Sequence, residues 1–110
     1  MWIFSTQGFL SIVQHKDMPD YFQVKSRTPV PLEELWPEQP IEVIEWADYR
    51  YRITILKTEV LSVLIDAMGE IDYTSFKDRC LMVQRNGIYD YHHVLGQIWK
   101  IMYDYQASME

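Results

Sequence analysis

The feature that most constrains the fold is a proline-rich stretch over residues 28–40. It holds four of the five prolines and separates two pairs of strand-like segments. Proline lacks a backbone donor and is well tolerated in a helix only within the first turn, so residues 32–36 form a helix of two turns at most, ending before Pro37. Runs of β-branched and aromatic residues predict strands over residues 9–16, 21–27, 41–46 and 49–56.

The remaining segments are one short N-terminal run and a helical second half. Residues 2–5 form either a strand paired with 9–15 as a hairpin, or the start of one long strand with a bulge at Gly8. Apolar residues at helical spacing predict three further helices. The first covers residues 58–68. The second starts at Asp72, Thr74 or Ser75 and reaches Val83, with a stop at Asn86-Gly87, and the third runs from about Tyr89 to Tyr105.

This order of segments indicates the α+β class. We expect an antiparallel four-stranded sheet covered on one face by helices, because two hairpins joined by a short helix leave one sheet face to be buried. The order ββαββα plus C-terminal helices also fits a circularly permuted ferredoxin-like topology, with the strands in the spatial order 1-2-4-3 and helices 58–68 and 89–105 on the sheet. A chain of 110 residues is expected to form a single domain over residues 1–110.

Charge and composition argue against several classes of protein. The net charge of −6 disfavours nucleic acid and anionic membranes as partners, since both attract Lys and Arg. No run approaches about 18 apolar residues, and residues 1–5 lack the basic start of a signal peptide, so a cytoplasmic location is expected. Cys80 is the single cysteine, which excludes an intrachain disulfide and a Cys-rich zinc site. We expect no metal and no cofactor.

Strand alternation predicts one basic sheet face on this acidic protein. If Ile53 and Ile55 face the helices, the side chains of Arg50 and Arg52 face away from them. The same alternation in the first two strands adds other residues to that face. The candidate ligand-binding set is Arg50, Arg52, Lys25, Arg27, His15 and Phe9, with Val13 beside it.

Three interpretations of this face stay open. In the first interpretation, Glu42 and Glu45 form ion pairs with the arginines across strands, and such pairs stabilise the fold only slightly. Alternatively, Phe9 and Val13 make the face a homodimer interface. In the third interpretation the arginine forks bind a phosphate or carboxylate group.

The other reactive residues have structural explanations. His92 and His93 are adjacent on a helix and point about 100° apart, so they cannot share a metal ion. Cys80 lies in an apolar run and behaves as a small hydrophobic residue. A polar and aromatic corner at Asp72, Tyr73 and Lys77 is a secondary candidate site, although capping by Asp72 and packing of Tyr73 explain it equally well.

Three segments are distinctive as a set: residues 1–15 (MWIFSTQGFLSIVQH), 47–52 (ADYRYR) and 70–77 (EIDYTSFK). Together they resemble a family of short, uncharacterised bacterial proteins, over nearly the whole chain to the helix at 94–103 that carries Trp99. The resemblance implies a stand-alone intracellular domain. The family has no assigned activity, so no catalytic residue follows from it.

The sequence therefore predicts a small interaction or regulatory domain that self-associates and has no catalytic residues. Its expected partner is a second copy or another protein. The alternative is a binder of an anionic small molecule, or an enzyme acting on one, in which Arg50 and Arg52 hold the anion and His15 acts as acid or base. Single-stranded nucleic acid stacked on Phe9 is the weakest of the three hypotheses.

Overall fold

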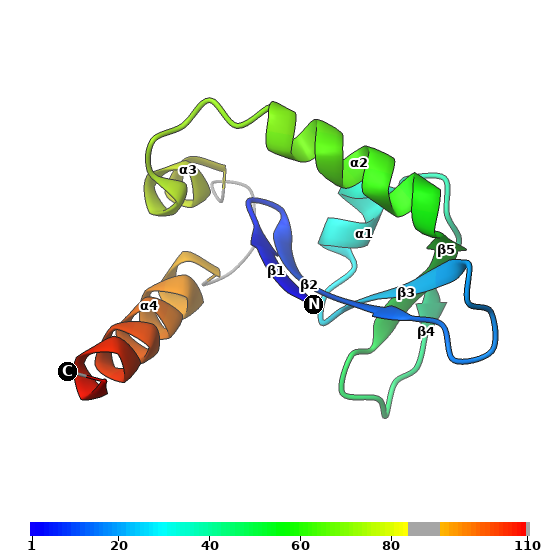
Figure 1. The fold of residues 1–110 in the computed structure, drawn as a ribbon, viewed down its shortest axis with the longest axis horizontal. Coiled ribbons are helices and arrows are strands. Elements are labelled where there is room, and N and C mark those ends of the chain that lie inside the picture. The colour runs from blue at the N-terminus through cyan, green and yellow to red at the C-terminus, as the bar shows by residue number, and fades with distance from the viewer. Residues whose placement is uncertain (84–90, 110) are drawn as a thin grey trace. The chain divides into compact units, whose positions relative to one another are not determined.

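The computed structural model describes residues 1–83 and 91–109, which belong to two compact units, Met1–Ile71 and Asp72–Glu110 (Figure 1). The predicted helix stop at Asn86-Gly87 and the predicted helix start at Tyr89 lie outside the described residues. A single domain over residues 1–110 stays a prediction, as does a helix over 89–105 that covers the sheet.

The N-terminal unit contains a five-stranded antiparallel sheet in the order β1-β2-β3-β5-β4 (Figure 1). The α+β class is confirmed, and the four predicted strands follow the expected order 1-2-4-3. Of the two alternatives for residues 2–5 the hairpin is found, which adds a fifth strand. The circular permutation stays a prediction. The strands are β1 (Trp2–Ser5), β2 (Gly8–Gln14), β3 (Tyr21–Ser26), β4 (Glu42–Val43) and β5 (Tyr51–Leu56).

Two helices bury one face of this sheet. Helix α1 (Val30–Leu35) begins at the prolines and ends before Pro37, as predicted, and α2 (Lys57–Gly69) follows β5 directly. Alternate residues of the central strands point toward these helices and form one core with them. The buried members of the core are Leu10, Ile12, Val24, Leu32, Trp36, Ile53, Ile55 and Val60.

Strand β4 is shorter than the sequence predicts. It holds two residues where six were expected, and the loop over residues 44–50 replaces a tight turn at Ala47-Asp48. The Ile44 amide donates to the Arg50 carbonyl at 2.8 Å, and the Ala47 amide donates back to the Ile44 carbonyl at 3.0 Å. The first bond continues the β4–β5 register by one position, and the second closes a turn over residues 44–47 within the loop. Trp46 in this loop is 89% exposed.

The C-terminal unit consists of α3 (Phe76–Val83) and α4 (Tyr91–Ser108). Among the described residues of this unit, Cys80 on α3 and Tyr91 and Leu95 on α4 are buried. Burial raises the pKa of the Cys80 thiol above its ordinary value of 9.0. Burial, and to a lesser degree the charge of Cys80, raise the pKa of Tyr91. Both groups are therefore held in their neutral, protonated form.

Raising the pH above about 9 is expected to destabilise this unit. Both pKa values are higher in the folded chain than in the unfolded chain, so their contribution to stability is complete below the unfolded pKa of Cys80 and is lost as the pH rises. Denaturant unfolding followed by circular dichroism between about pH 8 and pH 11 measures this loss. The double variant Cys80→Ala, Tyr91→Phe should show a flatter pH dependence, and an equally steep profile would contradict the assignment.

Candidate functional site

The face of the sheet opposite α1 and α2, named the open face, carries the predicted basic residues. Leu10, Val24 and Ile53 are buried against the helices, as the alternation predicts, so their strand neighbours point the other way. Lys25 lies directly opposite Arg52 in the ladder between β3 and β5. The open face is formed by Trp2, Phe4, Phe9, Ser11, Val13, Gln23, Lys25, Arg27, Glu42, Tyr49, Arg52 and Thr54.

Phe9 is the centre of an aromatic cluster on the open face. Its ring centroid lies 4.8 Å from that of Phe4, 5.5 Å from Trp2 and 6.2 Å from Tyr49. Edge-to-face and tilted contacts at these distances stabilise aromatic groups beyond the burial of their area. Trp2 nevertheless stays 67% exposed. Phe4, Phe9 and Tyr49 are half-buried, so the cluster combines three partly covered rings with one exposed ring.

Arg27 is held at the border of this cluster by three contacts. Its guanidinium carbon lies 4.4 Å from the Tyr49 ring centroid, a cation–π distance. Its Nη1 donates to the Asp48 carbonyl at 3.0 Å and pairs with the Asp48 carboxylate at 3.3 Å. The acidic partner is thus Asp48 in the loop, and in the described chain no ion pair joins Glu42 or Glu45 to an arginine.

Arg52 and Lys25 place two cations side by side. Arg52 donates from Nη2 to the Tyr49 carbonyl at 3.0 Å, while its Nε is buried and has no partner. Like charges directly opposite each other on two strands repel. Arg50 is exposed and precedes β5, and among the described residues its side chain makes no hydrogen bond or ion pair. The register therefore places Lys25 directly opposite Arg52, and the grouping of Arg50 with Arg52 stays a prediction.

His15 serves the turn that follows β2. Its Nδ1 accepts hydrogen bonds from the backbone amides of Asp17 at 3.1 Å and Met18 at 3.2 Å. It lies four residues along the chain from Ser11, which is in the row of Lys25, so about 13 Å separates it from that row. His15 is therefore not grouped with the basic residues.

The predicted corner in the C-terminal unit is held by Arg79. The Arg79 guanidinium pairs with Asp72 at 2.6 Å and lies 5.1 Å from the Tyr73 ring centroid. Ser75, not Asp72, caps α3, because its Oγ accepts from the Asp78 amide at 3.3 Å. Lys77 lies apart from this pair, with its Nζ 5.7 Å from the Trp99 ring centroid. Packing and ion pairing account for the corner.

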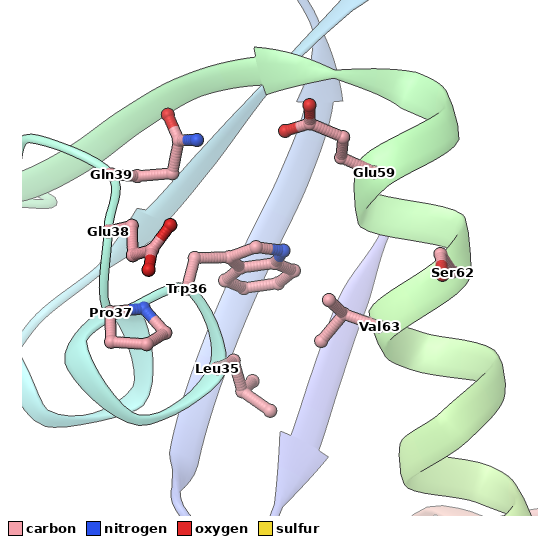
Figure 2. A pocket seen from close by; sticks show the side chains of 8 residues that line it. All are labelled: Leu35, Trp36, Pro37, Glu38, Gln39, Glu59, Ser62 and Val63. Atoms are coloured by element: carbon pink, nitrogen blue, oxygen red, sulfur yellow. The ribbon is translucent and has the colours of Figure 1, made fainter.

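A pocket between the end of α1 and the first turns of α2 was not predicted from the sequence (Figure 2). It has a volume of about 330 Å³. The proline stop after α1 was visible in the sequence, but the docking of α2 beside it is a tertiary contact without a local signal. The residues that line this pocket, named the Trp36 pocket, are Leu35, Trp36, Pro37, Glu38, Gln39, Glu59, Ser62 and Val63.

Comparison with known proteins gives no relative from which to carry over a function. No protein-family model, no curated protein and no solved structure matches the chain. Within residues 1–83 and 91–109, no helix combines the length and the apolar character that crossing a membrane requires. The same residues contain no group of three or more His, Cys, Asp or Glu side chains placed to hold a metal ion.

Proposed function

We propose that this chain is a small interaction domain that self-associates through the open face and has no catalytic site. The observation that carries the proposal is the partly exposed aromatic cluster around Phe9, bordered by Arg27. Tryptophan, tyrosine and arginine are the residues that most often dominate the affinity of protein interfaces. An exposed tryptophan packed against half-buried aromatic rings fits this composition.

The charges of the open face favour a second copy as the partner. Lys25 and Arg52 form a positive centre, whereas Glu42 follows Arg52 at the next position of the same row. In a two-fold dimer the same surface meets itself, so the positive centre of one copy can face the acidic edge of the other. Opposite charges in such positions fix the register of an interface.

Trp2→Ser is expected to weaken self-association at least about tenfold, because it removes the most exposed ring of the cluster. Sedimentation velocity over a concentration series measures the change. Trp46→Ser is the matched control, since this 89% exposed ring lies in the loop over 44–50 and makes no ring contact with the cluster in the described chain. A wild-type chain that stays monomeric at about 100 µM would contradict the proposal.

A second candidate function, binding of an anionic small molecule, is favoured by the Lys25–Arg52 pair. A phosphate or carboxylate placed between the two cations removes their repulsion and offers an acceptor to the unpartnered Arg52 Nε. The double variant Lys25→Gln, Arg52→Gln should raise the dissociation constant for citrate or pyrophosphate at least about tenfold. Lys16→Gln, in the turn after β2, is the control, and unchanged binding in the double variant would rule out the arginine site.

A further inference from the structure

The Trp36 pocket lies on the helix-covered side of the sheet and is a second surface with its own chemistry. Its walls come from two elements, residues 35–39 at the end of α1 and residues 59–63 of α2. Leu35, Pro37 and Val63 give it apolar walls, and Figure 2 shows polar groups around the indole ring. It is an open hollow of about 330 Å³ and not an enclosed cavity.

The indole nitrogen of Trp36 is a buried donor without an acceptor. The residue is 5% exposed, and within the described residues Nε1 has no hydrogen-bond partner. Figure 2 shows this nitrogen directed toward α2, on the side of Glu59 and Ser62. Buried donors are nearly always paired, so an unpaired one requires an acceptor beyond these side chains, such as a water molecule or a ligand atom.

Two carboxylates border the same pocket from its two walls. Glu38 follows α1, and Glu59 lies in the first turn of α2 (Figure 2). Both side chains are exposed, and in the described residues neither of them forms an ion pair. No lysine or arginine lines the pocket. The pocket therefore presents two uncompensated negative charges beside an aromatic ring.

We propose that the Trp36 pocket binds an arginine or lysine side chain from a basic segment of a partner protein. The cationic group is held by Glu38 and Glu59 beside the indole ring, which attracts cations through its π face. The methylene stem packs on Leu35 and Val63, as such stems do on apolar surface. A backbone carbonyl of the partner segment accepts the hydrogen bond from Trp36 Nε1. A peptide is favoured over a free amine because it supplies both the cation and the carbonyl acceptor.

Access to the indole nitrogen requires a small rearrangement. Nε1 has almost no exposed surface, so a neighbouring side chain has to move before a ligand atom reaches it. Glu59 and Ser62 are exposed on α2 and can change rotamer without disturbing the core.

The test follows the indole N–H of Trp36 by two-dimensional NMR of the ¹⁵N-labelled chain, with the signal assigned from its loss in Trp36→Phe. N-acetyl-arginine methylamide is the probe, and N-acetyl-citrulline methylamide is its neutral analogue. The arginine probe should move the Trp36 signal saturably, with a dissociation constant of about 1–10 mM, and the citrulline probe should not. Glu59→Gln should weaken binding at least about fivefold, whereas Glu42→Gln, on β4 outside the pocket, should leave it unchanged.

Three results would overturn the proposal. Equal shifts with the citrulline probe would remove the role of charge, and no shift at about 50 mM of the arginine probe would remove the site. Equal affinity for methylguanidinium, which has no carbonyl, would show that the pocket recognises a free cation and not a peptide. The test is independent of the open face, since Trp2→Ser should leave binding of the arginine probe unchanged.

Discussion

Gly8→Ala is expected to lower the free energy of unfolding by about 2–4 kcal/mol, through backbone strain together with a steric clash. Gly8 has a φ of +144°, a conformation that residues with a Cβ rarely adopt. A Cβ at this position would also lie 2.6 Å from Cγ of Pro31 in α1. The rigid proline ring cannot turn aside as the end of a flexible side chain would, so the β1–β2 hairpin or α1 has to shift.

Gly96→Ala is the matched control for this prediction. Gly96 lies inside α4 and has open space where a Cβ would be added. Alanine favours helix over glycine by about 0.5–1 kcal/mol, so the control should be neutral or slightly stabilising. Denaturant unfolding at constant pH measures both variants. If Gly8→Ala is as stable as the wild type, this result would contradict the close contact between the hairpin and Pro31.

Leu10→Ala is expected to destabilise the chain by about 3–5 kcal/mol, the range for a leucine whose removal leaves a cavity in a packed core. Leu10 lies on β2, has no exposed surface, and belongs to the core between the sheet and the two helices. Val13 lies on the same strand but on the open face, and is 40% exposed. Val13→Ala should therefore change stability by less than about 1 kcal/mol.

This pair of variants tests which side of β2 faces the helices. Chevron or equilibrium unfolding in urea gives both free energies under the same conditions. A larger loss for Val13→Ala than for Leu10→Ala would mean that the strand faces the other way. The open face would then consist of different residues, and the proposals that rest on it would fail with it.

Much of the fold was predictable because it follows from local patterns. The period-two alternation of β3 and β5 places Val24 and Ile53 in the core, and the prolines of α1 set its short length. The facing of Lys25 and Arg52 follows from the same alternation. These predictions need only the pleat of a strand and the chemistry of proline.

The contacts of the site were less predictable because they depend on loops and on tertiary packing. Arg27 pairs with Asp48 because the loop after β4 is wide, and no strand periodicity contains that information. His15 lies beside the turn after β2, and its Nδ1 accepts hydrogen bonds from the backbone amides of that turn. It therefore does not join the arginines. The Trp36 pocket exists only when α2 docks beside the end of α1.

The central claim, that copies of the chain meet through the open face, is tested most directly by isotope-filtered NMR on an equal mixture of labelled and unlabelled chains. This experiment reports only contacts between copies. The account predicts intermolecular contacts from the rings of Trp2, Phe4 and Phe9 to a second copy. Intermolecular contacts that arise instead from the exposed apolar side chains of α4, such as Met102 and Tyr105, would contradict it, as would the absence of any intermolecular contact.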